Sequence, residues 1–457
     1  MHPSPFKLLA LLRLGALLLA LNTLATANPA KEATPTLTAK ELVAAAIERH
    51  PDLASFAARL DAAGAQARER SAERLPRLSL EAGSQHFDDP TRIRPPLPDQ
   101  PAKFARDIWS GDLVLRWTAY SGGRLSAAEE AARLLEEASG ADLRFFQERM
   151  ATRVAQLYFE YSARKAIIRA SEKSLQSLRE QAKQIGQLLE QGKAAEVDRM
   201  RLDVRAASVE QSLIQQRNER KRLRASINFM IGRLLDERWE SAELVGEPMQ
   251  SPAVGEAPAP DGAALRSDLA AARLRLESAA ASVDQAKAAW RPQVQLFASH
   301  GHQGDWSGRE DFDRSIAGLQ LSWDVWDAGR RRAQVAAARA NAKTRAAELA
   351  SLSENRRLDL MIAQDDFDSA RERLDVAVLA TQTAEESLRI EQNKYAQGKG
   401  TIIDVLDAET AALEAESRFI RAEADVNISR AAVDFARGAA LSPLAACASL
   451  RQNDSSL

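Results

Sequence analysis

The chain has 457 residues with 64 acidic and 62 basic side chains, and this near balance excludes a basic surface for nucleic acid. Five histidines and the single Cys447 leave little material for a metal or haem centre and cannot supply an intrachain disulfide, so neither a cofactor nor a metal is expected. Charged residues make up 28% and aromatic residues 5%, a mixture typical of long, closely packed helices rather than of a compact enzyme core.

Residues 1–27 are predicted to be a secretory signal peptide. Lys7 and Arg13 flank the apolar run at 14–21, and small residues at 25–27 satisfy signal peptidase. The run is too short to span a bilayer comfortably, which argues against the alternative of a membrane anchor. No later stretch approaches the roughly 20 apolar residues of a membrane helix. We therefore expect an exported mature protein that carries no transmembrane helix.

The mature chain begins with a predicted helix at 39–75, and a similar helix is predicted at 262–290. Each ends at a proline, Pro76 or Pro292, which a helix tolerates poorly in its interior. The two prolines therefore mark the point at which each helix gives way to a different structure.

Two short strands are predicted after each of these helices. Leu319, Leu321 and Trp323 alternate with polar residues, and this period of two is typical of a strand with one wet face. The predicted strands are 77–82, 113–120, 293–298 and 319–326, with loops at 87–110 and 301–313 between the members of each pair.

Each strand pair leads through a glycine-containing turn into a very long helix, predicted at 124–191 and at 330–397. At 1.5 Å per residue such a helix is on the order of 100 Å long, far more than a globular domain needs. A return helix of about half that length is predicted at 198–231 and at 404–437. We expect each long helix to be flanked by two shorter ones placed end to end.

Near the first turn, apolar residues recur every three and four positions on both the outgoing and the return helix. Such spacing predicts a two-helix coiled coil at the tip, with these two faces in contact. The alternative, a merely amphipathic surface helix, is less favoured because both segments share the spacing. The residues are Leu175, Leu178, Ala182, Ile185 and Leu189 on the outgoing helix, and Met200, Val204, Ala207, Gln211 and Ile214 on the return helix.

The elements form two internal repeats, which the sequence shows by matches at one constant spacing without a gap from residue 113 onward; upstream the spacing is larger, because the first copy has a longer loop. The matches include Trp117 with Trp323, Gly192 with Gly398, Asp198 with Asp404 and Phe229 with Phe435. A repeat of this kind sets the architecture of the whole chain. The predicted organisation is a first repeat at 28–238, a linker at 239–261, a second repeat at 262–438 and a tail at 439–457.

Four short strands cannot enclose a pore, but several copies of the chain could do so together. Trp117, Tyr120, Trp323 and Trp326 gather at one end of the strands, as in the aromatic girdle of a transmembrane barrel. Isolated hairpins packed on helices are disfavoured because they are marginally stable. Closure leaves a trimer of twelve strands and a dimer of eight both open. The predicted fold class is mainly α with a small β part: a long-helix α-barrel with coiled-coil hairpins, joined to a transmembrane β-barrel that takes four strands from each chain.

The sequence resembles the TolC family of outer-membrane efflux proteins at LTAKELVAAAIERHPDL (37–53), DAGR (327–330) and YAQGKGTIIDVLDAET (395–410). With the duplicated layout, the resemblance covers nearly all of the mature chain. It implies a homotrimer with a twelve-stranded barrel in the outer-membrane lipid of a Gram-negative bacterium and a helical barrel that crosses the periplasm. It also implies two partners, a periplasmic adaptor (membrane fusion protein) and an inner-membrane pump of the RND or ABC class, for efflux of small molecules or type I secretion of proteins.

The same resemblance implies a gate at the periplasmic helix tips. Aspartates that match Asp404 and Asp407, one helical turn apart, form acidic rings around the closed entrance in the family. Spacing alone favours a plainer alternative, in which both acids stabilise a helix N-terminus. Asp198, which matches Asp404 in the first repeat, is expected to be a cap or an inter-helix partner.

Further residues around the two turns complete the predicted gate. Gly192 and Gly398 are expected to permit backbone angles that other residues avoid. Tyr395 and Asp198 match a contact that ties the closed tip in the family. The family's basic residue falls at Gly400, with Lys399 beside it, so we expect the latch to be altered or weaker.

Two other classes of function are less favoured by the sequence. An enzyme is not expected, because His50, His86, His300 and His302 are scattered and no acid, base and nucleophile converge. His300 and His302 are only a weak signal for a metal pair. A periplasmic coiled-coil adaptor is the alternative function, but an adaptor has one helical hairpin, whereas this chain has two hairpins with strands beside its long helices.

Overall fold

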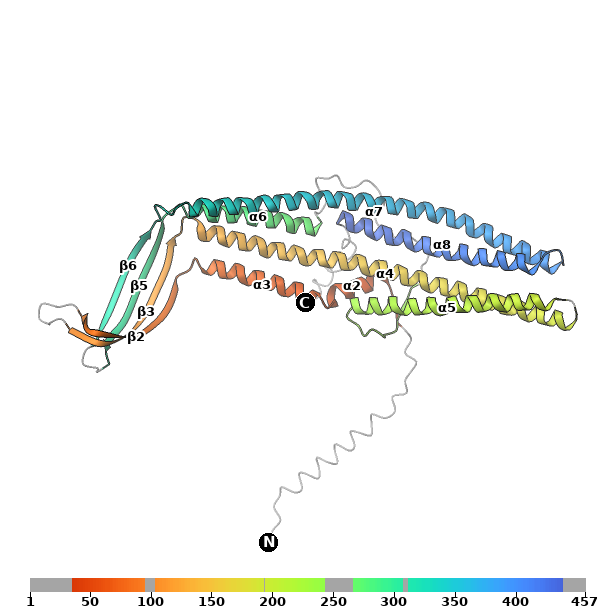
Figure 1. Cartoon of the computed structure of the whole chain (residues 1–457), viewed down its shortest axis with the longest axis horizontal. Coiled ribbons are helices and arrows are strands. Elements are labelled where there is room, and N and C mark those ends of the chain that lie inside the picture. The colour runs from red at the N-terminus through yellow and green to blue at the C-terminus, as the bar shows by residue number, and fades with distance from the viewer. Residues whose placement is uncertain (1–34, 95–102, 193, 243–265, 307–310, 439–457) are drawn as a thin grey trace, which may run out of the picture.

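The computed structural model describes residues 35–192 and 194–438, apart from 95–102, 243–265 and 307–310. The predicted signal peptide, most of the linker and the tail with Cys447 lie outside the described residues. Figure 1 shows a long helical body with a curved sheet at one end and two helical turns at the other. The prediction of a mainly helical chain with a small β part and two internal repeats is confirmed.

The helices follow the predicted order, with one correction. Their bounds are α2 Ala39–Arg49, α3 Leu53–Ala72, α4 Arg124–Glu190, α5 Glu196–Met230, α6 Ser267–Ala288, α7 Arg330–Ala396 and α8 Ile402–Arg437. The single helix predicted at 39–75 is wrong, because α2 ends at Arg49 and the next residue, His50, has a non-helical ψ of 132°. The next residue is Pro51, and the residue before a proline is driven out of the helical region. None of the helices in the part of the chain described here is both long and apolar enough to cross a membrane.

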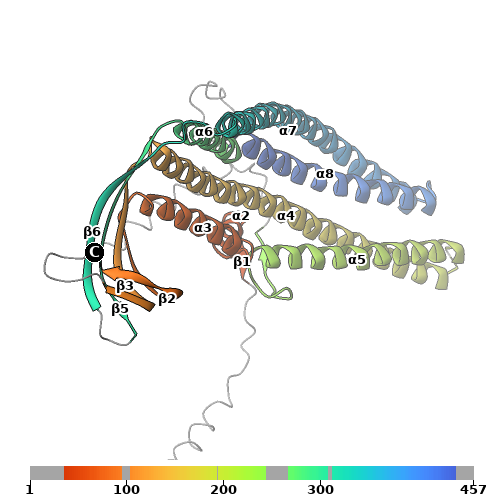
Figure 2. The ribbon, with the colours of Figure 1, turned by 60° about the vertical axis from the view of Figure 1, so that its left-hand side comes forward.

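Each of the two long helices, α4 and α7, has 67 residues and is flanked by two shorter helices in line, as predicted. Helices α3 and α5 lie along α4, and α6 and α8 lie along α7 (Figures 1 and 2). Helix α4 also packs against α6 and α8, so it joins the two halves. Seen around the tip, the helices stand in the order α5, α4, α8, α7. Helices α5 and α7 are therefore the outer members of this row.

The sheet contains β2 (Arg77–Arg94), β3 (Lys103–Tyr120), β5 (Gln293–Asp305) and β6 (Asp311–Ser322), antiparallel in that order. The strands are longer than predicted, and most of the residues assigned to loops at 87–110 and 301–313 lie within them. Polar residues dominate those segments, and their few apolar side chains, such as Phe104 and Ile108, do not form a sustained alternation that the sequence could reveal. The prediction of strand at 323–326 is also wrong, since β6 ends at Ser322.

The half of the sheet nearest the helices has one leucine-rich face and one mixed face that carries charged pairs. On the apolar face, cross-strand pairs include Leu78 with Leu115, Leu80 with Leu113 and Leu296 with Leu319. On the opposite face, Arg116 pairs with Glu81 and Arg314 pairs with Asp112. The leucines are exposed in the isolated chain. The two outer strands, β2 and β6, each have one unpaired edge within the described sheet.

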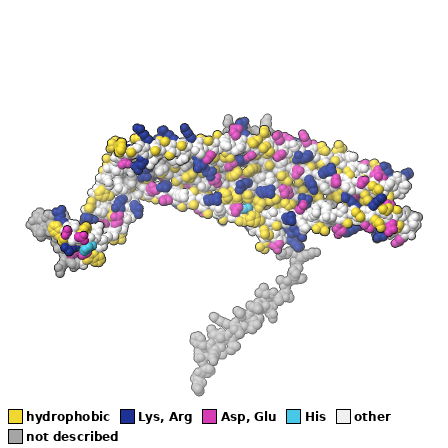
Figure 3. Space-filling model, in the orientation of Figure 1, with side chains coloured by type: hydrophobic (Ala, Val, Ile, Leu, Met, Phe, Trp, Pro, Cys, Tyr) yellow, Lys and Arg dark blue, Asp and Glu magenta, His cyan; other side chains and the backbone are white. Residues whose placement is uncertain are grey.

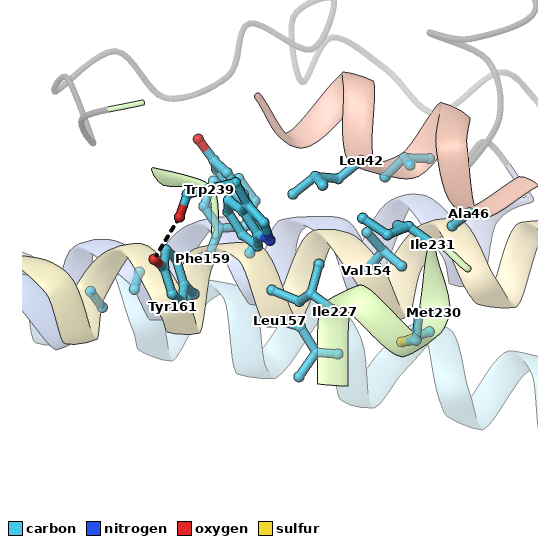
Figure 4. Packing of buried hydrophobic residues seen from close by; sticks show 14 of the residues in the cluster. Leu42, Ala46, Val154, Leu157, Phe159, Tyr161, Ile227, Met230, Ile231 and Trp239 are labelled. Carbon is cyan, nitrogen blue, oxygen red and sulfur yellow. Dashed lines mark hydrogen bonds between the residues drawn. The ribbon is translucent and has the colours of Figure 1, made fainter. Parts of the chain in front are cut away.

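The largest core lies midway along the body, where α2 and α5 cover α4 (Figure 4). Trp239 is fully buried there; its indole Nε1 donates to Asn228 Oδ1 at 2.7 Å, and Tyr161 Oη donates to its carbonyl at 3.3 Å. The next two residues form β4 (Glu240–Ser241), which pairs in parallel with β1 (Thr36–Leu37). The packed structure of the first half thus extends three residues beyond the predicted linker boundary at 239. Over the rest of the visible face, acidic and basic side chains are interspersed (Figure 3).

The coiled coil at the first tip is confirmed on α4 but has a different face on α5. Leu178 and Ile185 of α4 are buried, as predicted. The α5 residues that pack there are Leu202, Val209 and Leu213, whereas the predicted residues Met200, Val204 and Ile214 are exposed. Helix α5 carries two apolar stripes, and spacing could not decide which of them faces α4.

Two glycines with similar backbone angles should respond differently to substitution. Gly192 has φ +69° with open space around it, whereas at Gly232, with φ +66°, an added Cβ would lie 2.6 Å from the carbonyl oxygen of Arg49. Gly192→Ala should cost about 1–2 kcal/mol through its left-handed backbone alone. Gly232→Ala should cost more, because it also displaces the end of α2. Equal shifts in the thermal unfolding midpoint, followed by circular dichroism in detergent, would contradict this packing.

Candidate gate at the helical tips

Two short turns connect the helices at the end of the molecule that lies farthest from the sheet (Figure 1). Gly192 and Gly398 have φ of +69° and +71°. Their N–H groups donate to the carbonyls of Leu189 at 2.8 Å and Tyr395 at 2.9 Å. A residue with a Cβ is strained at such angles, so the predicted reason for glycine at both turns is confirmed.

The second turn begins α8 with a capping box built by Thr401 and Asp404. Thr401 Oγ1 accepts from the Asp404 N–H at 3.3 Å, and Asp404 Oδ2 accepts from the Thr401 N–H at 3.0 Å. The Thr401 hydroxyl also donates to Asp404 and, with the backbone N–H, lowers the pKa of that carboxyl. Within one chain, Asp404 therefore has the plainer helix-capping role. Asp407 follows one turn later and is exposed.

The first turn lacks this cap, because Ala195 stands where the second turn has Thr401. The Asp198 carboxylate is left without a capping hydroxyl and lies 3.7 Å from Arg201 Nη1. It also lies near the Tyr395 hydroxyl of the second hairpin. Burial, and then the Asp198 charge, raise the pKa of Tyr395. The Asp198 charge thus acts on Tyr395 across the two hairpins, and the latch itself stays a prediction.

Lys399 and Gly400 make no equivalent contact to the first hairpin in the described part of the chain. Lys399 Nζ donates to Gln397 Oε1 at 3.1 Å, within its own turn. A Cβ at Gly400 would lie 3.2 Å from the Lys394 Cβ and 3.3 Å from the Tyr395 nitrogen. Gly400 therefore lets the turn pack tightly on the last turn of α7, where a basic side chain would have to push it away.

The four aromatic residues predicted for the girdle fall into two groups, one hydrogen bonded to the backbone and one exposed. The Trp117 indole Nε1 donates to the Arg74 carbonyl at 2.9 Å, and the Trp323 Nε1 donates to the Trp290 carbonyl at 3.1 Å. In both repeats, then, a tryptophan secures the end of the helix that precedes the strands. Tyr120 and Trp326 are exposed, Trp326 to 84%. All four lie at the helical end of the sheet, and their membrane role remains a prediction.

A functional candidate that sequence reasoning missed is Glu409 of α8, a buried carboxylate that contacts α4. Its signal was present, because Ile402, Val405 and Glu409 share the helical spacing of one face. Among the described residues, no group of three or more His, Cys, Asp or Glu side chains could hold a metal ion. His300 and His302 instead contact Ser315 and Asp313 on β6.

Comparison with known proteins found one family model, described as outer membrane efflux protein, that matches residues 42–233 and 262–439. No curated protein matches significantly. Among solved structures, the outer-membrane channel OprN is 23% identical, with a TM-score of 0.72 over 88% of this chain and 90% of that one. The outer membrane protein VceC of Vibrio cholerae is 22% identical, with a TM-score of 0.71 over 88% and 96%. The open state of the Neisseria gonorrhoeae MtrE channel is 18% identical, with a TM-score of 0.69 over 88% and 89%.

Removing the capping hydroxyl should loosen the start of α8. Thr401→Ala should cost about 1 kcal/mol of local stability and speed amide exchange at residues 402–408 about fivefold. Thr410→Ala is a matched control, because its hydroxyl donates to the Leu406 carbonyl and caps nothing. Equal exchange in the two variants, measured by mass spectrometry, would refute the capping role.

Proposed function

We propose, from the premise that the chain belongs to the outer membrane efflux protein family, that three identical copies form a continuous exit duct gated at its helical tips. The protein is an outer-membrane efflux channel, with its sheet in the membrane and its helices in the periplasm. The expected resemblance to the TolC family is confirmed by this membership. The observation that carries the proposal of several copies is the sheet, which has two free edges and one exposed apolar face.

The sheet supports assembly into a closed barrel. An exposed strand edge offers unpaired backbone groups, which lipid cannot satisfy. Three copies would bring β2 of one next to β6 of another and close twelve strands, within the range of known barrels. The strands have 18, 18, 13 and 12 residues, more than the roughly 9–11 that span a membrane. We assign the leucine-lined half to lipid and the polar half, with His302, to the outside; His300, which pairs with Leu113, lies at the boundary between the two halves.

The internal repeat supplies the docking mode for the helices. Met200, Ala207 and Ile214 of α5 match Leu406, Leu413 and Ile420 of α8 in the second repeat. The α8 residues pack in the core of the chain, whereas Met200 and Ile214 of α5 are exposed. We infer that α5 docks on α7 of a neighbouring copy as α8 docks on α4. Helix α7 offers exposed apolar side chains for this contact: Val376, Leu379 and Ile390.

The tips are the proposed gate. Three copies would place Asp404 and Asp407 of each chain near one axis, where carboxylates repel one another and attract cations. Asp404 keeps its capping role, so Asp407 is the freer member of the pair. Asp198 and Tyr395 would tie the two hairpins of one copy when the gate is closed. We further propose that a periplasmic adaptor and an inner-membrane pump, of the RND or ABC class, dock at this end.

Purified full-length protein tests the proposal. Added to planar lipid bilayers it should conduct ions, and light scattering in detergent should give three copies per particle. Ile214→Glu should break the trimer and abolish conductance, because it places a charge in the α5–α7 contact. Gln215→Glu is the control, since its counterpart in the second repeat, Arg421, is exposed. A water-soluble monomer without conductance would refute the function, and an intact Ile214→Glu trimer would refute the docking mode.

Removing the exposed acid at the tip should weaken cation block. In bilayers, Asp407→Ala should raise the concentration of a trivalent cation needed for half block by roughly an order of magnitude. Glu414→Ala, an exposed acid two turns further along α8, should leave the block unchanged. An unchanged block in Asp407→Ala would rule out Asp407 as a ring residue. That result would not argue against the proposed trimer or its conductance.

A further inference from the structure

Glu409 of α8 is buried where the two helical hairpins of one chain meet. Its side chain is 4% exposed. Its Oε1 accepts from Ser174 Oγ at 3.2 Å and its Oε2 accepts from Gln181 Nε2 at 3.3 Å. Both donors belong to α4, so the carboxyl group spans the junction between the α4–α5 and α7–α8 hairpins. The apolar cluster of the tip, which includes Leu178 and Val405, comes from the same helices.

The cation that acts on Glu409 is Arg205 of α5. Within the described residues, Arg205 Nε is buried without a hydrogen-bond partner. Glu409 therefore lies in a buried junction with one nearby positive charge, that of Arg205. The Nε atom of Arg205 donates no hydrogen bond there. Isolated ionised groups are costly in such places.

Several other charged groups of the packed helices form ion pairs with one another. On α4, Glu172 pairs with Arg217 and Arg179 pairs with Glu210, and both partners belong to α5. On α7, Lys394 pairs with Glu391 near the turn. On α8 itself, Glu414 pairs with Arg418 on the exposed side of the helix. None of these pairs includes Glu409.

The site accommodates the neutral acid better than the carboxylate. Burial raises the pKa of Glu409, and the hydrogen bonds from Gln181 and Ser174 and the charge of Arg205 only partly oppose this. A neutral carboxyl can donate to Ser174 Oγ, which has free lone pairs, and still accept from Gln181 Nε2. Both contacts across the junction therefore survive protonation.

We propose that Glu409 is a proton-dependent tie between the two hairpins, which holds the tips together as a neutral acid and loosens them as a carboxylate. This inference rests on the proposed function, in which the tips gate a duct. If the hairpins separate, Glu409 enters water and ionises in its ordinary range. The closed junction is thus most stable at low pH and loses stability as the pH rises through the raised pKa. Each unit of pKa difference between the two states changes their ratio tenfold.

Only the second repeat has a buried acid at this position of its return helix. The counterpart of Glu409 in the first repeat is Asp203 of α5, which is exposed in the chain. The counterparts of its donors Ser174 and Gln181 are Ala380 and Ser387 of α7. Ala380 cannot donate a side-chain hydrogen bond, so the tie belongs to the junction within one chain.

Hydrogen exchange of the full-length protein in detergent tests the tie directly. After correction for the intrinsic pH dependence, exchange at residues 174–181 and 402–409 should increase at least several-fold as the pH rises from about 4.5 to about 8 in the wild type. Glu409→Gln keeps an acceptor and gains a neutral donor, so it should hold the low-pH level of protection throughout. Glu414→Gln, the matched control on the exposed side, should keep the wild-type step.

Open probability in planar bilayers provides the second readout. It should rise over the same pH range in the wild type and in Glu414→Gln, and stay low in Glu409→Gln. A wild-type pH step in Glu409→Gln would overturn the proposal, and so would a wild type without any step in exchange. Absence of conductance in every variant would refute the proposed channel instead, because the exchange measurement does not depend on conduction.

Discussion

The structure depends on one constraint. Its sheet has two unpaired edges and one exposed apolar face, and no other part of the described chain covers the edges or the face. Strands β2 and β6 carry the free edges, and leucines such as Leu80 and Leu319 line the exposed face. A soluble protein would cover such a sheet with helices, but here the helices lead away from it (Figure 1). In an outer-membrane efflux protein the apolar face can contact lipid, and identical copies would pair with the free strand edges.

The duplicated sequence extends the same reasoning to the helices. Leu406 and Ile420 of α8 show how one return helix packs on a long helix, and Met200 and Ile214 of α5 repeat that pattern without a partner in the chain. One copy thus contains both a completed contact and an incomplete version of it. The proposed ring of copies would complete the second contact with the geometry of the first, so a barrel of helices would need no packing mode beyond the one already present.

The sequence predicted those features that depend on a few neighbouring residues, such as helix continuity and the two glycine turns. The long helices contain no proline, and the turns need the positive φ of Gly192 and Gly398, so both were readable from sequence. The polar halves of the strands were not readable, because hydrogen-bonded pairing leaves no pattern in polar side chains. The face of α5 was misassigned because its second apolar stripe, with Val204, has the same spacing as the buried one. The break at Pro51 was readable from the residue-before-proline rule, but the continuing helical pattern obscured it.

The differences between the two repeats, rather than their likeness, mark the tip as a working part. Thr401 occupies Asp404 in a cap, whereas Ala195 leaves Asp198 to face Tyr395. Burial of Glu409 likewise depends on three helices coming together, so no single helix of the sequence could reveal it. Two equivalent hairpins would have no reason to separate in one direction. Asp198 and Glu409 both act across the junction inside one chain. In the proposed ring, the junction between copies would lack the contact of Glu409 with Ser174, because Asp203 and Ala380 stand at the positions of Glu409 and Ser174.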